Sequence, residues 1–502
     1  DFTLQNHSYF HTSYQNVVMQ ELGEAALALK MFQQGLYGEE KWKTRALMHH
    51  NQEVQDSILN WLALPDGELA MPNGNDWSLF LYDQITSYST LACFLQDPNA
   101  LMLENQAYKY IKARQKTTPD GSWLLRPDVG ARRMGVEAHR VMMTFLMHEV
   151  LPTAQLTPTA WEDFNKTYGK AKLIPCQNIV RAATDDRFTC FSWSEGLKSY
   201  TGYFAANSPD KNKIVVPYRA NNTGNLLGWY EVEGKRTNAT PVVSGIYQFQ
   251  GNSYVMNGEL NTNDGTLNHR FVLYSTPENA LIYLDQVTAN ANATITAAKG
   301  GLLAISTDEL MKTTRTLYYK NGKQTSDGSQ LITFDSPWVN IDNELGVIND
   351  NHNLNHNSKP STLNSQPNIA FGDRTSNNSI FTSKLYPLYS DTRREVKANE
   401  VVDTRNLVYY SRINAKKTQK MAKRLISLKD LLPEGWNGVM VPDAHHSYII
   451  ISNFKGENTA TLTHLKLKGW TPVFPETTHL KKNGSTLTLQ VEQNHSVVFI
   501  RK

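Results

Sequence analysis

The start of the chain brings together several side chains that can move protons. Residues 1 to 16 contain pairs of histidine, tyrosine and asparagine, and an apolar helical pattern begins directly after them at Val17. An imidazole accepts a proton, a phenol donates or accepts one, and an amide donates hydrogen bonds to a developing negative charge. On a loop and a first helical turn, such side chains can point into a cleft. The pairs are His7 and His11, Tyr9 and Tyr14, and Asn6 and Asn16.

This segment has two interpretations. One is a site for acid–base chemistry, because several proton-transfer groups in one short stretch are hard to explain by packing alone. The other is structural: the aromatic rings pack against a helix end, and the histidines are solvated or hydrogen-bonded.

Helices are expected to position this segment. From residue 12 to about residue 173, apolar residues recur three and four positions apart, which predicts antiparallel helices joined by short loops. Asp97 before Pro98 and Thr157 before Pro158 match the preferred residues at the first positions of a helix. The pattern predicts a helical domain over residues 1–178, with helices at Val17–Phe32, Lys41–Leu62, Ser78–Leu95, Pro98–Lys116, Val136–Val150 and Pro158–Lys172.

Two loops between these helices have a composition typical of carbohydrate sites. Residues 64–77 and 118–135 each combine glycines, a tryptophan and polar groups. An indole face covers the apolar face of a sugar ring, while amide and guanidinium groups bind its hydroxyls. The alternative is an ordinary turn whose tryptophan packs on a helix.

The second half of the chain has the pattern of β-strands. After Ile179 the apolar residues alternate, β-branched and aromatic residues increase, and glycine, asparagine and aspartate mark turns. This predicts antiparallel sandwiches over residues 179–424 and a smaller sandwich over residues 425–502, which begins with a short helical piece, Leu425–Leu432. The clearest strands are Lys213–Tyr218, Gly245–Gln250, His269–Tyr274, Ala280–Val287, Ser447–Ser452, Ser485–Val491 and Ser496–Arg501.

Bulk composition narrows the class of protein. A length of 502 residues implies more than one domain, and a net charge of +3 without a long basic block argues against a nucleic-acid partner. No apolar run reaches the ~18 residues of a membrane span, so no segment is expected to span a membrane. Three cysteines are too few for a disulfide scaffold. The sequence leaves open whether Cys176 and Cys190 form one disulfide in an oxidising compartment or remain two thiols. Composition does not indicate an oligomeric state.

The polar stretch at residues 343–379 is the place where a metal ion is conceivable. Its histidines and aspartates are suitable ligands, but their spacing matches no standard pattern, which favours a solvated loop. We therefore expect that no cofactor is required, with a structural divalent cation as the open alternative.

The order of these features resembles a known family of enzymes. Asp1–His7 followed by Tyr14 is similar to the segment of chondroitin AC, hyaluronate and xanthan lyases in which an Asp-led aromatic run reaches a catalytic histidine and then a catalytic tyrosine. The interval here is about two residues shorter. Residues 128–135 resemble the family's Gly/Arg segment. Residues 218–230 resemble its Asn-Gly-Glu-Asn followed by Gly-Trp, without the acidic residue.

The resemblance implies an α+β multidomain fold, with an incomplete (α/α) toroid followed by antiparallel β-sandwich domains. It also implies a secreted or periplasmic enzyme that acts on an acidic polysaccharide or oligosaccharide. The family uses an asparagine from helices upstream of its histidine segment. Either such helices precede Asp1 in a longer chain, which we expect because the predicted helices do not close a toroid, or Asn6 performs that task.

The implied reaction is β-elimination at a uronic acid. It needs a base to remove the proton from C5, an acid to protonate the leaving 4-linked oxygen, and a donor to the carboxylate. We expect Tyr14 as acid and base, His7 as base or as the partner that orients Tyr14, Asn6 as the carboxylate contact, and Arg133 as the cation that lowers the pKa of the tyrosine from ~10. Expected substrate contacts are Trp77, Trp123, Arg132, Arg140, Asn225 and Trp229.

Two other functions remain open at this stage. A glycoside hydrolase needs two carboxyl groups across the scissile bond, which Asp76 with Asp128 or Glu137 would supply. A non-catalytic glycan-binding protein needs none of these roles. The sequence also leaves open which uronic acid is recognised, whether cleavage is endo or exo, and whether His7 or His11 is nearer the chemistry.

Overall fold

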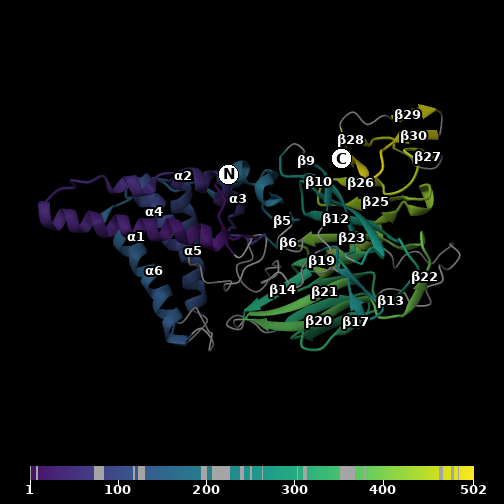
Figure 1. Cartoon of the computed structure of the whole chain (residues 1–502), viewed down its shortest axis with the longest axis horizontal. Coiled ribbons are helices and arrows are strands. Elements are labelled where there is room, and N and C mark those ends of the chain that lie inside the picture. Colours follow the sequence, from purple (N-terminus) through teal and green to yellow (C-terminus); the bar gives the residue numbers. More distant parts are fainter. Residues whose placement is uncertain are drawn as a thin grey trace.

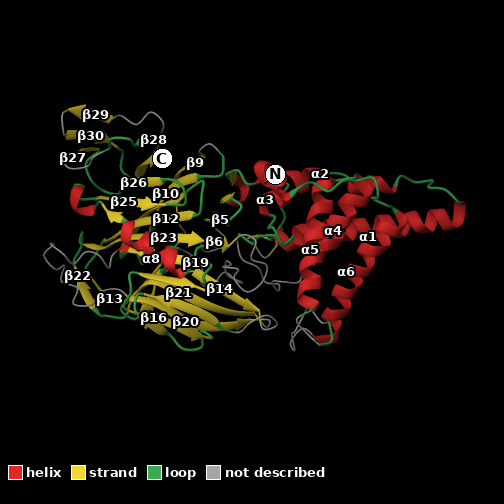
Figure 2. Ribbon diagram, turned by 180° about the vertical axis from the view of Figure 1, so that it is seen from behind, coloured by secondary structure: helices red, strands yellow, loops and turns green. Residues whose placement is uncertain are grey.

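The computed structural model shows helices at one end of the molecule and antiparallel sheets at the other (Figures 1 and 2). The N-terminus lies near the join between the two parts, and the C-terminus lies among the last sheets. The expected α+β class with helices first is confirmed; closure of a toroid stays a prediction. The structure describes residues 2–6, 9–72, 84–116, 119–121, 130–193, 200–205, 226–237, 242–248, 251–262, 264–301, 303–308, 314–350, 368–377, 380–462, 467–475, 480–483 and 486–502.

The helical part begins with one long helix. Its described elements are α1 (Thr12–Tyr37), the 3-10 helix η1 (Thr44–Met48), α2 (Asn51–Val54), the π-helical turn η2 (Gln55–Leu59), α3 (Asn60–Leu62), α4 (Ile85–Thr90), the π-helical turn η3 (Leu91–Leu95), α5 (Pro98–Gln115), α6 (Gly130–Val150) and α7 (Trp161–Tyr168).

One predicted helix start is confirmed. The Asp97 carboxylate accepts from the backbone N–H groups of Asn99 and Ala100 at 2.7 and 3.2 Å, with Pro98 in the first turn of α5. These two bonds satisfy donors that have no partner inside the helix.

Two other predicted helices differ from the structure. The helix expected at Lys41–Leu62 is broken, because His50 has a φ of +64°, in the left-handed region that interrupts a helix. The helix expected at Pro158–Lys172 covers only Trp161–Tyr168, because the chain then turns toward the sheets: the Ala171 N–H donates to the Gly251 carbonyl at 3.0 Å, and a strand begins at Lys172.

Helix α4 lies at the centre of the helical part and contacts α1, α5 and α6. Its buried face is unusually polar, and the hydroxyls of Thr86 and Thr90 bond to backbone carbonyls at 2.9 Å. Helix α1 approaches closely at Gly23, where a Cβ atom would stand 2.0 Å from Thr90 Oγ1. The absence of a side chain at Gly23 therefore lets the two helices touch.

A small sheet connects the helices to the sandwich. It consists of β3 (Lys172–Ile174), β4 (Ile179–Ala183), β5 (Arg187–Ser192) and β6 (Tyr200–Ala205), paired in chain order. Strand β4 is buried along its whole length.

Two large antiparallel sheets form the centre of the β part. The first, in order of pairing, contains β16 (Gly322–Ser326), β15 (Arg315–Tyr319), β18 (Trp338–Ile341), β19 (Leu345–Asn349), β23 (Val401–Ser411), β12 (Ala280–Ala289), β11 (Leu267–Ser275), β10 (Tyr254–Asn261) and β9 (Val242–Gln248). The second contains β17 (Ile332–Phe334), β20 (Asn368–Asn377), β21 (Ile380–Ser390), β13 (Ala293–Gly300), β7 (Trp229–Val232) and β8 (Lys235–Arg236), with β14 (Leu303–Asp308) on β21 and β22 (Arg394–Val396) on β13.

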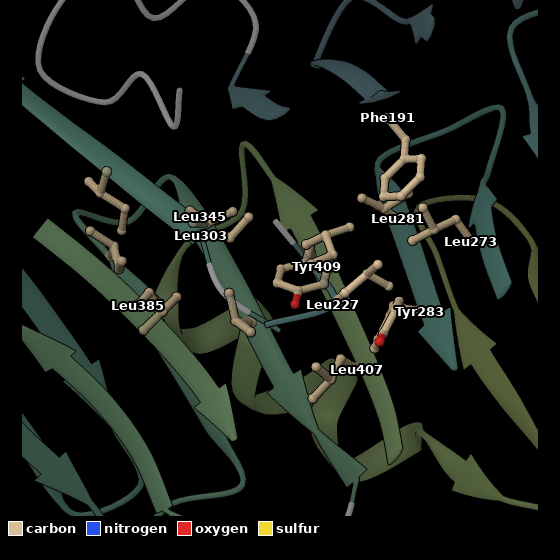
Figure 3. Packing of buried hydrophobic residues seen from close by; sticks show 14 of the residues in the cluster. Phe191, Leu227, Leu273, Leu281, Tyr283, Leu303, Leu345, Leu385, Leu407 and Tyr409 are labelled. Atoms are coloured by element: carbon tan, nitrogen blue, oxygen red, sulfur yellow. The ribbon is translucent and has the colours of Figure 1, made fainter. Parts of the chain in front are cut away.

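The main core lies between these sheets. Inward side chains from both sheets meet in one apolar cluster, among them Leu281 and Leu407 from the first and Leu303 and Leu385 from the second (Figure 3). Phe191 of β5 joins the same cluster. The core therefore binds the connecting sheet to the sandwich: Phe191 belongs to this cluster, whereas Phe188 and Cys190 on the other face of β5 belong to the core of the helical part.

The last part of the chain is a smaller β unit. Helix α8 (Ala415–Arg424) precedes it, and the helical piece expected at Leu425–Leu432 is instead the strand β24 (Ile426–Ser427) and a 3-10 turn, η6 (Lys429–Leu431). Leu428 N–H donates to the Gly438 carbonyl, which draws this segment onto the sheet. The strands are β25 (Trp436–Pro442), β26 (Ser447–Asn453), β27 (Thr459–Leu462), β28 (Thr471–Phe474), β29 (Leu480–Asn483), β30 (Thr486–Gln490) and β31 (His495–Arg501).

Of the strands named in the sequence analysis, those around residues 245, 269, 280, 447, 485 and 496 are present, whereas Lys213–Tyr218 lies outside the described residues. The domain limits 1–178, 179–424 and 425–502 stay predictions.

Candidate functional site

A short hairpin leads into α1. Strands β1 (Gln5–Asn6) and β2 (Tyr9–Phe10) pair, and the His11 N–H donates to the Leu4 carbonyl at 3.2 Å. The Gln15 amide on α1 accepts from Leu4 N at 2.6 Å and donates to the Phe2 carbonyl at 2.9 Å. The first residues are therefore fixed to the first turn of the helix.

The same hairpin is tied to the β part. Gln5 Nε2 donates to Gln177 Oε1 at 3.2 Å, and Gln177 Nε2 donates to Thr3 Oγ1 at 2.7 Å. Gln177 lies between β3 and β4 and is buried. Residues that precede the helical part therefore contact the connecting sheet at the turn between β3 and β4.

His11 and Tyr14 lie against each other at the start of α1. His11 caps the helix: its Nδ1 accepts from the Tyr14 N–H at 3.4 Å and is 3.2 Å from Ser13 Oγ. The two rings are 4.3 Å apart between centroids and meet edge to face at 76°. His11 is fully buried and Tyr14 is partly exposed. Because Nδ1 accepts, a neutral His11 carries its proton on Nε2.

Buried polar side chains of α1 and α4 form a layer of hydrogen bonds beside this turn. Ser87 Oγ donates to the buried Asn16 Oδ1 and to the Gln84 carbonyl, the latter at 2.8 Å. Gln84 Nε2 and the Tyr88 hydroxyl donate to the same acceptor, the Gly67 carbonyl, at 2.8 and 3.0 Å. The bond between Ser87 and Asn16 therefore joins α4 to α1 two residues beyond Tyr14.

Helix α6 lies beside this layer. Thr86 Oγ1 donates to the Arg140 carbonyl at 2.9 Å, and His139 Nε2 is 2.8 Å from Glu24 of α1. Arg140, 7 % exposed, donates to the Glu137 carboxylate at 3.0 Å. The predicted rim contact Arg140 is therefore engaged in a buried ion pair with Glu137.

The structure describes only part of the predicted site. His7, Trp77, Trp123 and Asn225 lie outside the described residues, as do Asp76 and Asp128. Asn6 lies in β1, and Arg132 and Arg133 lie in the first turns of α6, but their side chains are outside the described part. Their roles stay predictions.

Trp229 lies in a different setting from Tyr14. It begins β7, is 9 % exposed, and contacts the edge of Tyr386 with ring centroids 5.9 Å apart. The Arg236 guanidinium lies 4.0 Å from the centroid of its ring. A sugar that stacked on this indole face would have to replace Arg236.

Two polar groups of the helical part were not predicted from the sequence: the hydrogen-bonded layer beside Tyr14 and a pair of carboxylates, Asp56 and Asp97. Gln52 Nε2 donates to both Asp56 and Asp97, at 3.1 and 2.8 Å, and burial raises the pKa of Asp56. Asp97 caps α5, and Asp56 accepts from Asn60 at 3.1 Å and from Tyr168 at 3.3 Å. One feature of the sequence could have indicated both groups: polar residues stand at helix positions that the apolar spacing assigns to the buried face.

The structure also bears on the cysteines, the possible metal site and membrane-spanning helices. Cys176 and Cys190 are free thiols, the first exposed and the second buried. Within the described residues, no group of three or more metal-ligating side chains is found, and most of the polar stretch, residues 351–367, lies outside them. None of the described helices is long and apolar enough to cross a membrane.

Comparisons with known proteins give partial likenesses. No protein-family model matches the chain, and no curated protein sequence matches it. Among solved structures, a chondroitinase AC lyase in complex with oligosaccharides has a TM-score of 0.32 at 12 % identity, over 91 % of this chain and 76 % of that one. A heparinase III has a TM-score of 0.31 at 11 % identity, over 86 % of this chain and 63 % of that one.

A third similar structure is a hydrolase. The α-galactosidase AgaB from Geobacillus stearothermophilus has a TM-score of 0.33 at 7 % identity, over 49 % of this chain and 41 % of that one. This chain thus spans about two fifths of the length of the α-galactosidases it matches. All of these identities and scores are too low to assign an activity. The described architecture is that of an α+β protein with helices followed by antiparallel sheets.

Proposed function

We propose that this protein is a polysaccharide lyase that cleaves a uronic-acid-containing glycan by β-elimination. The observation that supports it best is the contact between the His11 and Tyr14 rings at the first turn of α1, with Tyr14 partly exposed. Gln15 of this turn bonds to Leu4, and the neighbouring Thr3 bonds to Gln177 in the turn between β3 and β4 of the connecting sheet. A phenol fixed at such a junction suits proton transfer to a bound glycan.

The reaction breaks the C5–H bond and the bond from C4 to the glycosidic oxygen, and a C4–C5 double bond forms. Tyr14 accepts the proton from C5 as phenolate and, as phenol, protonates the leaving oxygen. The ordinary pKa of a tyrosine, ~10, must be lowered for the first step. Arg133, and beside it Arg132, in the first turns of α6 would supply the positive charge that does so.

His11 and His7 receive different roles in this proposal. Because His11 is fully buried and caps α1, we assign it the positioning of Tyr14. His7 remains the alternative to Tyr14 as the base that removes the C5 proton, or a second partner that orients Tyr14. Asn6 remains the candidate donor to the uronate carboxylate, whose developing negative charge needs a fixed hydrogen-bond donor.

The finer features of the proposal follow the resemblance seen in the sequence. They are an (α/α) toroid, a secreted or periplasmic location, and an acidic polysaccharide as the substrate. Trp77, Trp123, Arg132 and Asn225 are the proposed substrate contacts. No cofactor is assigned, because the elimination needs only an acid, a base and a donor to the carboxylate.

A hydrolase is less well supported by the described residues. Of the carboxylates considered for it, Glu137 is 2 % exposed and ion-paired with Arg140 at 3.0 Å. A general acid must reach the glycosidic oxygen, which an enclosed and paired carboxylate does not do. The products separate the two reactions, because elimination yields an unsaturated uronide that absorbs ultraviolet light and hydrolysis does not.

The test is incubation of the protein with a panel of uronate-containing glycans while ultraviolet absorbance is followed. We expect absorbance to rise with at least one glycan, and to stop rising in Tyr14→Phe and His7→Ala. Tyr37→Phe, at the exposed far end of the same helix, is the matched control and should keep the activity. New reducing ends without ultraviolet absorbance would overturn the lyase and favour hydrolysis.

A further inference from the structure

A cavity on the helical part has the composition of a sugar-binding site. It lies between α5, α7 and the turn that joins β4 to β5, and its volume is about 380 Å³. This is within the range of ~300–1,000 Å³ typical of small-ligand pockets. None of its lining residues has a role in the proposed elimination. Besides Pro65, the lining consists of Gln106, Lys109, Tyr110, Trp161, Glu162 and Asp185.

One side of the cavity is aromatic and preformed. Trp161, the first residue of α7, stacks on Phe164 with centroids 5.4 Å apart and planes 28° apart. Phe164 is 3 % exposed and belongs to the helical core, so the indole is held in one orientation while it remains partly exposed. Tyr110 of α5 is partly exposed and also lines the cavity. Because the rings are already fixed, a sugar that stacks on them would not lose binding free energy to their immobilisation.

The polar side of the cavity carries a net negative charge. Glu162 and Asp185 contribute two carboxylates, and Lys109 contributes one ammonium group. Asn165 Nδ2 donates to Asp185 Oδ1 at 2.8 Å, which orients that carboxylate. Carboxylates accept hydrogen bonds from sugar hydroxyls, but they repel a ligand that carries its own carboxylate or sulfate.

We propose that this cavity binds a neutral sugar unit, a monosaccharide or disaccharide, with its apolar face on Trp161 and its hydroxyls on Glu162, Asp185 and Gln106. It takes a class of ligand different from that of the proposed elimination, which acts on an acidic sugar. The cavity would therefore hold a neutral sugar unit of the same glycan whose acidic units undergo the elimination. This assignment does not depend on Tyr14.

The test is calorimetric titration of the full chain with neutral and anionic disaccharides. The neutral probes are cellobiose, lactose and N,N′-diacetylchitobiose, and the anionic probe is digalacturonic acid. We expect at least one neutral probe to bind, and the anionic probe to bind about tenfold more weakly or not at all. Binding in Tyr14→Phe should equal that of the wild type, so that failure of the lyase proposal and failure of this one can be told apart.

Three variants locate the binding. Trp161→Ala should abolish it, and Glu162→Gln, at an exposed position that threatens folding less, should weaken it about tenfold. Thr167→Ala, at an exposed position of α7 outside the lining, is the matched control and should bind as the wild type does. The proposal is overturned if no neutral probe binds, if the anionic probe binds better, or if Glu162→Gln and Trp161→Ala both leave affinity unchanged.

Discussion

Two histidine–tyrosine pairs occupy opposite environments in this molecule. At the start of α1, the His11 and Tyr14 rings touch beside a partly exposed surface. In the sandwich, His269 Nε2 is 3.0 Å from the Tyr283 hydroxyl, and both are buried between the large sheets. Both pairs have residue types that suit acid–base catalysis, so the residue types alone do not identify a site.

The sheet pair is locked by charged neighbours. His269 Nε2 and the Tyr283 hydroxyl both donate to the Asp285 carboxylate, the former at 2.6 Å, and Arg405 Nε donates to the same carboxylate at 2.7 Å. Burial lowers the pKa of His269 and raises that of Tyr283, so each is held neutral. A proton-transfer residue needs access to substrate and freedom to change charge, and this network has neither.

The largest expected difference is in activity. Tyr14→Phe should lower the rate of elimination by about 10²–10⁴-fold, the typical contribution of a general acid or base, because the phenol proton is lost. The free energy of unfolding should change by less than ~0.5 kcal/mol, as for most partly exposed sites. Tyr283→Phe should do the opposite: normal activity per folded molecule and lower stability. Ultraviolet absorbance measures activity and urea unfolding measures stability. If Tyr14→Phe and Tyr283→Phe changed both quantities equally, the two histidine–tyrosine pairs would not differ in role.

Arg405→Met should be the most destabilising change in the sheet network. It leaves the fully buried Asp285 carboxylate without its cation, which typically costs ~3–5 kcal/mol. The control is Arg393→Met, because Arg393 and Glu395 form an exposed ion pair with an N–O distance of 3.6 Å, and such pairs contribute ~0–1 kcal/mol. Urea unfolding of both variants measures the difference. Similar losses would show that burial does not set the strength of this ion pair.

The network should also make stability depend on acid pH. Burial is the largest single influence and favours the neutral acid, but the Arg405 charge together with the interactions of His269 and the hydrogen bonds of both residues outweighs it and lowers the pKa of Asp285 to about 2 from its usual 3.8. A carboxylate with a lowered pKa stabilises the fold above its unfolded pKa, so up to ~2 kcal/mol should be lost as the pH falls from about 4 to about 2. The double variant Asp285→Asn/Arg405→Met should not show this decrease in the free energy of unfolding between about pH 4 and pH 2. Unfolding midpoints across this pH range test it, and an unchanged slope in the double variant would contradict it.

The smallest expected effect separates the two tasks of His11. Both His11→Ala and His11→Asn remove a fully buried ring and should destabilise the protein, but His11→Asn keeps a capping side chain and should lose ~1 kcal/mol less. Both variants remove the ring that touches Tyr14 and should lower activity by the same factor. If His11→Asn restores full activity, the histidine only caps the helix and does not position the tyrosine.

Local sequence was enough to predict several features. The cap at Asp97 and the strands around His269, Ala280 and Ser447 follow from turn chemistry and from the period of apolar residues, both of which act over a few positions. The grouping of polar aromatic residues before Val17 also marked the segment that holds Tyr14. His11 and Tyr14 are three residues apart, so the helix itself brings their rings together.

Tertiary structure decided what local sequence left open. The helix expected to continue to Lys172 ends at Tyr168 because Ala171 bonds to Gly251, about eighty residues later. His269, Asp285 and Arg405 meet only because three strands pair in one register, which joins residues up to 136 positions apart in the sequence. The cover of Arg236 over Trp229 likewise depends on the β7–β8 turn packing. Amino-acid types and spacing define which elements form, whereas burial and access, which separate a catalytic histidine from a structural one, arise only when distant elements pack.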